Sequence, residues 1–285
     1  MKPLVLLVAF LATAVFAEVT KDFQPTAGIK MEKDIPYIPD GDEAQKLDIY
    51  VPETSADKPL PLIVHIHGGG WRAGSKFPCP VMGMVFKGYA VASVGYRFSQ
   101  KAIFPAQIQD CQAAIRWLRA HAKEYNFDSE HVGVIGGSAG GHLSALVGTS
   151  GGKKAFPPIG GHLDESDLVQ AVIDIYGPAD FSTVVQQAAE DKNVKNIFDF
   201  NTPSDPYSSL IGTKLDDKPK ADAVSPVHSV SKDSPPFLIL HGTHDTLVPY
   251  AQSVQLEAAL KAQSVPVWLQ TLPGSGHGGP LAPAR

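Results

Sequence analysis

Cysteine is scarce in this chain of 285 residues, which has two, Cys79 and Cys111. Two thiols exclude a disulfide scaffold, the device that holds together small exported domains with little core. One bridge between the two remains open. Against it stands the position of Cys111 on the apolar stripe of a predicted helix, where a buried free thiol behaves as a small hydrophobe. No histidine accompanies either cysteine in a glycine-rich turn, so neither is predicted to be catalytic.

An excess of positive charge is also missing. Lys and Arg number 24 against 29 Asp and Glu, the formal net charge is -5, and the basic residues are scattered rather than arranged in a stripe. Nucleic acid is therefore not an expected partner. No internal repeat is visible, and a hydrophobic content of 44% is ample for the core of one large α/β domain.

The apolar run at the N-terminus is too short to predict a membrane span. Met1 and Lys2 give a positive start, Pro3–Phe16 is apolar, and Ala17 precedes Glu18. This pattern predicts a signal peptide over residues 1–17, with cleavage after Ala17. We therefore expect a secreted or periplasmic protein with no membrane span in the mature chain; the alternative is an uncleaved anchoring segment.

The rest of the chain alternates strand and helix patterns. An extended polar arm is expected over residues 18–44, and the main domain over 45–285. Its predicted strands are 45–51, 62–67, 89–96, the apolar run from 132, 171–176, 237–242 and 267–272; its longer helices are 107–125, the segment after Ser138, and 250–263. This alternation predicts an α/β fold with a mostly parallel, doubly wound sheet and helices on both faces.

Residues 181–236 interrupt that alternation. A short helix is expected near Val184–Ala189, and Pro, Ser, Asp and Lys dominate the remainder of the segment. Long irregular segments in compact domains are usually functional walls or lids, so a cap-like insertion is predicted here. Its aromatic residues are candidates either for lining a substrate pocket or for packing beneath a loop: Phe181, Phe198, Phe200 and Tyr207.

The sequence Gly136-Gly137-Ser138-Ala139-Gly140 matches G-x-S-x-G. An apolar run precedes it and small residues come after it, which predicts a strand that turns sharply into a helix with Ser138 at the apex. Such a turn exposes the serine hydroxyl at the top of a sheet. The Ala139 N–H opens the helix, where an anion is favoured, so it is a candidate oxyanion-hole donor.

Three further groups lie just after predicted strands and supply what a serine nucleophile lacks. His277, among glycines, is the candidate general base, and Asp245 is expected to orient it. The amides of Gly69 and Gly70 are candidate oxyanion-hole donors beside that of Ala139. In doubly wound sheets such strand ends meet at one edge, where ligands bind.

Each role has rivals. His244 adjoins Asp245 on one turn, and His142 lies on the nucleophile helix, so both are expected to be structural. Asp174 and Asp180 compete with Asp245 for the acid role. Three further histidines, His65, His67 and His241, raise the question of a metal site. No acidic residue accompanies them at ligand spacing, so neither a metal nor a cofactor is predicted.

Taken together, these motifs resemble the carboxylesterase branch of the α/β-hydrolases. The closest likeness is to the bacterial feruloyl-esterase-like group, which is similar to the hormone-sensitive-lipase family. The likeness spans roughly residues 45–279. It is carried by His67–Trp71, Gly136–Gly141, His241-Gly242 with Asp245, and Gly276–Gly278, and between them by Tyr96-Arg97, Phe104–Ala106 and Asp110 with Arg116–Leu118.

The resemblance implies the α/β-hydrolase fold and a secreted serine esterase with a Ser138-Asp245-His277 triad. Its substrate would be a short-chain or aromatic carboxylic ester, including feruloyl or acetyl esters on plant polysaccharide. Trp71 would either contact substrate or pack the oxyanion loop. The alternatives are a peptidase or formamidase of the same fold, or a catalytically silent hydrolase fold that binds esters. The oligomeric state is not predicted.

Overall fold

The structure is a computed structural model that describes residues 26–278, except 55, 154, 196–198, 201 and 203. The predicted signal peptide, the first residues of the predicted arm, Phe198 and residues 279–285 therefore lie outside the described residues. Within the described part of the chain, no helix is both long enough and apolar enough to cross a membrane.

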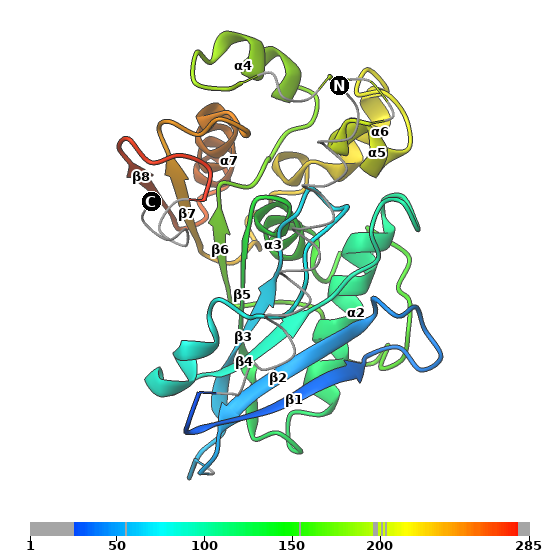
Figure 1. Ribbon diagram of the computed structural model, residues 1–285, viewed down its shortest axis with the longest axis vertical. Helices are drawn as coiled ribbons and strands as arrows, with labels where there is room; N and C mark the ends of the chain where they lie inside the picture. The colour runs from blue at the N-terminus through cyan, green and yellow to red at the C-terminus, as the bar shows by residue number, and fades with distance from the viewer. Residues whose placement is uncertain are drawn as a thin grey trace, which may run out of the picture.

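One sheet of eight strands organises the molecule, in the order β1-β2-β4-β3-β5-β6-β7-β8 (Figure 1). β2 is antiparallel to both β1 and β4, and every other neighbouring pair is parallel. The strands are β1 (Ile29–Pro36), β2 (Lys46–Pro52), β3 (Leu60–Ile66), β4 (Ala90–Val94), β5 (Phe127–Gly137), β6 (Ala171–Ile175), β7 (Phe237–Gly242) and β8 (Val267–Leu272). The predicted mostly parallel sheet is confirmed.

β1 lies within the segment for which an extended arm is predicted. It forms the edge of the sheet, pairing with β2 across an irregularity between Glu32 and Ile35. Asp34 has a positive φ of 58° there, and its N–H donates to the Asp48 carboxylate at 2.8 Å. The broken alternation of this strand explains why periodicity alone does not reveal it.

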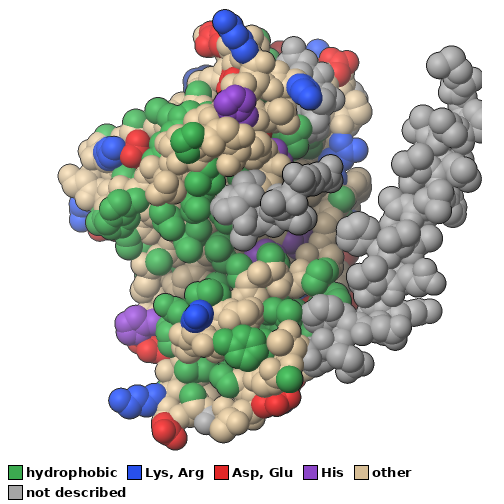
Figure 2. Space-filling view, turned by 60° about the vertical axis from the view of Figure 1, so that its left-hand side comes forward, with side chains coloured by type: hydrophobic (Ala, Val, Ile, Leu, Met, Phe, Trp, Pro, Cys, Tyr) green, Lys and Arg blue, Asp and Glu red, His purple; other side chains and the backbone are tan. Residues whose placement is uncertain are grey.

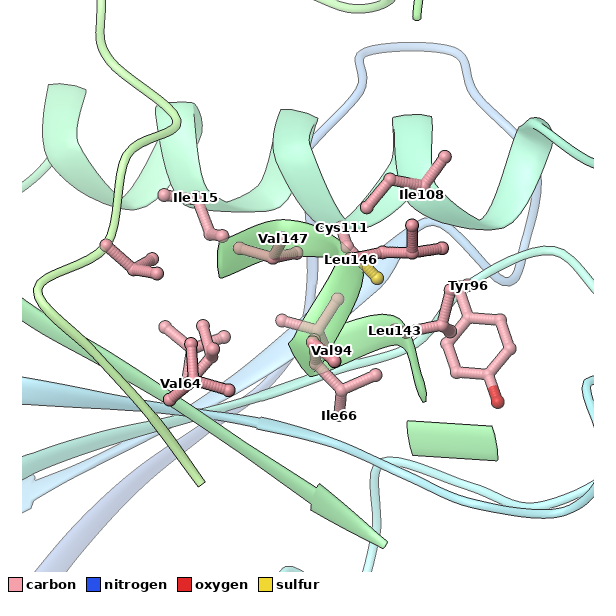
Figure 3. Packing of buried hydrophobic residues seen from close by; sticks show 14 of the residues in the cluster. Val64, Ile66, Val94, Tyr96, Ile108, Cys111, Ile115, Leu143, Leu146 and Val147 are labelled. Carbon is pink, nitrogen blue, oxygen red and sulfur yellow. The ribbon is translucent and has the colours of Figure 1, made fainter. Parts of the chain in front are cut away.

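Three long helices cover one face of the sheet: α2 (Ala106–Ala120), α3 (Ala139–Ser150) and α7 (Tyr250–Ala262). Ile108, Cys111 and Ile115 of α2 point toward side chains of α3 and the sheet, including Leu143, Leu146, Val64 and Ile66 (Figure 3). The stripe predicted for α2 is buried, and so is nearly all the rest of this helix, including Asp110, Arg116 and Arg119. β3 and β5 lie at the centre of the sheet, and this packing fixes the position of their carboxyl ends.

The opposite face is more thinly covered. The 3-10 helix η1 (Met82–Lys87) packs there, in a small separate cluster with Tyr50 and Val91. Beyond it lies a groove of about 640 Å³ whose lining includes Ile63, Ile135 and Ile173. Figure 2, which brings the β8 side forward, shows hydrophobic side chains gathered on this face. Trp268 of β8 is 63% exposed.

The predicted insertion contains more helix than its composition suggests. It holds α4 (Val184–Glu190), α5 (Pro206–Ile211), α6 (Lys218–Val224) and the 3-10 helix η2 (Pro226–His228). The Asp205 side chain caps α5 by accepting from two backbone N–H groups, and Asp217 caps α6 in the same way with one. In both cases a proline lies within the first turn, a helix-start signal that favours helix despite the polar composition.

Both cysteines are free and buried. Cys111 belongs to the core beneath α2, whereas Cys79 belongs to the cluster around η1 on the other face of the sheet. The open alternative of a bridge is therefore wrong in this structure.

Candidate active site

Ser138 lies between the end of β5 and the start of α3. Its φ of 56° and ψ of -123° are strained for a residue with a side chain. Its N–H donates to the Ile175 carbonyl at 2.9 Å, and its own carbonyl accepts from His142 N–H at 3.0 Å. These two backbone hydrogen bonds fix the sharp turn from β5 into α3. The G-x-S-x-G pattern predicts such a turn.

Close approach of α3 to β3 explains the glycines around Ser138. A Cβ on Gly140 would lie 2.1 Å from the Ile66 carbonyl oxygen, and one on Gly136 would lie 2.6 Å from the same atom. Both contacts are far below van der Waals distance, and both are with backbone. Only glycine therefore allows the helix to begin this close to the central strand.

The loop after β3 has three consecutive residues with positive φ: Gly69 at 115°, Gly70 at 60° and Trp71 at 57°. Within the described residues, the N–H groups of Gly69, Gly70 and Ala139 donate to no backbone acceptor. Ala139 is the first residue of α3, so its N–H has no partner inside the helix. All three residues line the same cavity as Ser138.

Trp71 anchors this loop in the core. Its indole is 2% exposed and packs against Phe181 and Tyr207. Its Nε1–H donates to His142 Nδ1 at 3.2 Å, and His142 Nε2–H donates to the Val224 carbonyl at 2.8 Å. One buried histidine thus connects the loop, the nucleophile helix and the end of α6. Burial lowers the pKa of His142 to about 4, which keeps this link neutral.

Asp245 and His277 come together from the loops after β7 and β8. His277 Nδ1–H donates to Asp245 Oδ2 at 2.8 Å, and Asp245 Oδ1 accepts from the N–H groups of Leu247 and Val248. Asp245 is buried, whereas the His277 side chain is 16% exposed. The acid is held rigidly, and the histidine extends from it toward the cavity.

A second imidazole contacts the same carboxylate. His241 Nε2 lies 3.3 Å from Asp245 Oδ2, while its Nδ1 is 2.7 Å from the Ser253 hydroxyl. Burial acts to raise the pKa of Asp245, but the hydrogen bonds from His241 and His277 outweigh it and hold the pKa well below its ordinary value. The carboxylate is therefore ionised throughout the neutral and mildly acidic range.

Ser138 and His277 line one cavity of about 660 Å³. Apolar side chains from the insertion and from the loop after β7 form part of its wall: Pro206, Tyr207, Leu247 and Val248. Within the described residues, no hydrogen bond joins the Ser138 hydroxyl to His277. Such bonds are often long in ligand-free hydrolases and tighten when substrate binds.

The rival residues lie elsewhere. His244 is exposed and contacts Thr243, and His142 forms the buried link described above. Asp174 accepts from Gly177 N–H, and Asp180 accepts from Ser182 and Gln255, so neither contacts His277. His65 and His67 bond to Ser93 and to the Gly68 carbonyl. Among the described residues, no group of three or more histidine, cysteine or acidic side chains is placed to hold a metal ion.

The insertion's aromatic residues divide between the two predicted roles. Phe181 is fully buried beneath Trp71, so it packs under the loop, whereas Tyr207 also lines the cavity. Phe200 is half-buried against Tyr207.

Two residues of this site are absent from the prediction made from sequence. His241 is considered there as a metal ligand and as part of a family motif, but not as a partner of the Asp245 carboxylate, although its position four residues before Asp245 in a strand-to-loop turn is a signal for contact. Tyr176, at the end of β6, lines the cavity and packs against His277 with ring centroids 4.5 Å apart. Its only signal in the sequence is its place at a strand's carboxyl end.

The sheet, the sharp turn at Ser138 and the loops after β3, β7 and β8 define an α/β-hydrolase. The sequence profile of the BD-FAE family matches residues 47–260, and the chain belongs to that family. Its fold was expected from the resemblance and is confirmed.

Several curated relatives are named as esterases or carboxylic ester hydrolases. Esterase LipQ of Mycobacterium tuberculosis is 33% identical over 254 residues, 87% of this chain and 57% of that protein. The chain thus spans little more than half the length of the curated relatives it matches. A solved structure titled as a truncated carbohydrate esterase from gut microbiota is 33% identical, with a TM-score of 0.76 over 87% of this chain and 89% of that one. An acetyl ester-xyloside bifunctional hydrolase from Caldicellulosiruptor lactoaceticus is 27% identical, with a TM-score of 0.69 over 86% and 87%.

Proposed function

We propose that the chain hydrolyses carboxylic esters through an acyl-enzyme formed on Ser138. The observation that carries this proposal is the 2.8 Å hydrogen bond between Asp245 and His277 on the wall of the cavity that Ser138 lines. A strained serine, an imidazole oriented by a buried carboxylate and unpaired amides are the parts that acyl transfer requires.

In the first step, the Ser138 oxygen attacks the ester carbonyl carbon while His277 Nε2 takes the hydroxyl proton. Asp245, ionised and bonded to Nδ1–H, stabilises the imidazolium that forms. The tetrahedral intermediate collapses, the proton passes from His277 to the departing alcohol, and the acyl group remains on Ser138. Water, deprotonated by His277, then attacks the acyl carbon to form a second tetrahedral intermediate. This intermediate collapses with cleavage of the bond to the Ser138 oxygen, which takes the proton back from His277, and the carboxylic acid leaves.

The negative charge on the carbonyl oxygen is received by the N–H groups of Gly69, Gly70 and Ala139. None of them donates to a backbone acceptor within the described residues, so they are free to bind it. The start of α3 adds the positive end of a helix dipole. A single donor of this kind typically stabilises the transition state by about 3 kcal/mol.

The favoured substrate class is a short acyl ester, acetyl above all, carried by a polysaccharide. Support comes from the solved structures named as a carbohydrate esterase and an acetyl ester-xyloside hydrolase. A feruloyl ester is the second candidate, because a cavity of about 660 Å³ with apolar walls also has room for an aromatic acyl group.

The test is a panel of aryl acetate, aryl octanoate, methyl ferulate, acetylated xylan, an aminoacyl anilide and N-formylkynurenine, with wild type beside Ser138→Ala. We expect ester turnover that Ser138→Ala abolishes, with acetyl esters fastest. Faster turnover of the anilide or of the formamide would favour the peptidase or the formamidase. A folded protein that turns over nothing would overturn the proposal and favour a binding role.

The pH dependence tests the base. His277 must be neutral to accept the proton from Ser138. Asp245 stays ionised in mild acid, because its pKa is held well below the ordinary value. We therefore expect kcat/KM to fall in acid with a single protonation; a flat profile down to pH 4 would contradict the role of His277.

We also infer export, with removal of residues 1–17. The support is the sequence pattern alone: a positive start, an apolar run and Ala17 before Glu18. N-terminal sequencing of protein from a secreting host should begin at Glu18, and an intact Met1 on protein retained in the cell would overturn the inference.

A further inference from the structure

Tyr176 is held in a backbone conformation that tyrosine rarely adopts. Its φ is 47°, in the left-handed region that favours glycine, and it comes directly after the last residue of β6. Its N–H donates to the Leu240 carbonyl at 2.8 Å, and the preceding carbonyl, that of Ile175, accepts from Ser138 N–H. The strained residue is therefore fixed between β7 and the nucleophile turn. Residues in such conformations persist where the surrounding structure holds them, and they cluster at active sites.

The Tyr176 ring spans the gap between the nucleophile turn and the base. On one side its centroid lies 4.5 Å from that of His277, with the ring planes inclined by 50°. On the other side it lies against Gly137: a Cβ there would come within 3.2 Å of the tyrosine hydroxyl oxygen. The absence of a side chain at Gly137 leaves the space that the ring fills. Tyr176 is 7% exposed and lines the cavity.

The Asp245 carboxylate orients His277 by a hydrogen bond to one ring atom, Nδ1. The far side of the ring, which carries Nε2, can still shift when the side-chain torsions or the loop after β8 move. Nε2 must nevertheless point at the Ser138 hydroxyl, and small misplacements of reacting groups are costly. A second contact on the face of the ring removes this freedom, and Tyr176 supplies it.

We propose that Tyr176 is a positioning residue, whose ring holds His277 in the orientation that directs Nε2 to Ser138. The proposal rests on the triad proposed above. It also explains why a strained tyrosine occupies this position. Glycine or asparagine would relieve the backbone strain, but neither has a ring that could pack against the His277 imidazole. The contact is with the ring, so the hydroxyl group is dispensable for this role.

The experiment compares Tyr176→Gly, Tyr176→Asn and Tyr176→Phe. Glycine and asparagine both tolerate a positive φ, so each removes the ring without adding strain. We expect kcat on aryl acetate to fall about 10- to 100-fold in both, with KM within about threefold of wild type. Tyr176→Phe should restore kcat to within about threefold of wild type, because phenylalanine keeps the ring.

Ser264→Gly is the matched control. Ser264 also has a positive φ, 59°, but it is exposed in the turn between α7 and β8. Relief of strain there should leave kcat unchanged. Wild-type kcat in Tyr176→Gly or in Tyr176→Asn would overturn the proposal, and so would a loss in Tyr176→Phe as large as that in Tyr176→Gly, which would assign the role to the hydroxyl.

Labelling with an alkyl fluorophosphonate separates this proposal from the proposed function. The activated serine oxygen displaces fluoride from phosphorus and His277 takes the proton, so the rate reports activation of Ser138 without any choice of ester. Wild type should be labelled at Ser138, and Tyr176→Gly should be labelled more slowly by the factor seen in kcat. Absence of labelling in wild type would contradict the proposed triad. Labelling of Tyr176→Gly at the same rate as wild type would contradict only the role of Tyr176.

Discussion

The two halves of the proposed active site are held in different ways. Ser138 and the loop from Gly69 to Trp71 are parts of the main core: α3 is buried along its whole length, and Trp71 is bonded to His142 in the interior. His277 instead comes after β8, the edge strand, and the structure gives its side chain the Asp245 hydrogen bond and the contact with the Tyr176 ring. The position of Ser138 therefore depends on core packing and cannot be altered without loss of stability. The position of His277 depends on a few contacts and can be altered with little loss of stability.

His277→Gln should disable only the base half of the proposed site, which consists of His277 and Asp245. Without an imidazole to accept the serine proton, kcat should fall by about 10⁴-fold or more. Asp245 keeps its bonds from His241, Leu247 and Val248, so the free energy of unfolding should change little. Ester kinetics and urea unfolding measure the two quantities. A large loss of stability would show that the base half is as much a part of the core as the nucleophile half.

Gly140→Ala should disrupt the nucleophile half of the proposed site, which consists of Ser138 and the loop from Gly69 to Trp71. Stability should then fall together with activity. The added Cβ would lie 2.1 Å from the Ile66 carbonyl oxygen, and backbone on both sides prevents an easy adjustment. We expect the free energy of unfolding to fall by about 3 kcal/mol or more, the upper end for overpacked sites. Gly161→Ala is the control, since a Cβ there meets nothing within 4 Å. Equal stability of the two variants would mean that α3 can move away from β3.

Acid should lower the stability of the protein through two buried histidines beside the nucleophile half of the site. Burial lowers the pKa of His142 and of His67 to about 4. In the unfolded chain these groups take up protons below about pH 6.5, so stability should fall as the pH drops from there toward 4. Each group contributes a slope of about 1.4 kcal/mol per pH unit. Unfolding curves across this range should show a slope smaller by about that amount in His142→Gln; an unchanged slope would mean that His142 is protonated in the folded protein.

Asp174 should have the opposite pH dependence, since it should lower the stability as the pH rises. Burial raises its pKa to about 6, and its Oδ2 has no hydrogen-bond partner among the described residues. Its stabilising contribution is complete below about pH 4 and is lost as the pH rises through 6, so the ionised carboxylate destabilises the fold at pH 8. Asp174→Asn should therefore raise the free energy of unfolding at pH 8 by about 1 to 3 kcal/mol and have little effect at pH 4. An equal effect at both pH values would exclude ionisation as the cause.

The parts of the fold that can be predicted from sequence are those with strong periodicity. Predicted and observed bounds agree for β7 and β8 and nearly agree for α7, whereas α2 begins as predicted but ends at Ala120, five residues before the predicted end. β1 could not be predicted, because an irregular edge strand has neither continuous burial nor alternation. α5 and α6 escape prediction because polar composition masks two Asp caps with a nearby proline.

Within the site, motifs indicated the residues that are proposed to carry the chemistry, and the contacts among them came from the fold. The glycine spacing placed Ser138 on a strand-to-helix turn, because only that backbone requires glycine on both sides. No spacing predicts that Tyr176 touches His277, since the two lie on different strand ends brought together only by the order β6-β7-β8. The second imidazole on Asp245 likewise depends on the rotamer of His241, which its neighbours in the core select.

The sequence by itself therefore determined the class of fold and the set of candidate reactive groups, because hydrophobic period, glycine placement and G-x-S-x-G act locally along the chain. The tertiary structure decided that a second imidazole, His241, meets the Asp245 carboxylate, which face of the sheet stays thinly covered, and that a tyrosine in a strained conformation packs against His277. Those outcomes depend on strand order and on packing between segments far apart in sequence. No local pattern encodes distances between such segments, and only the assembled sheet brings them within contact.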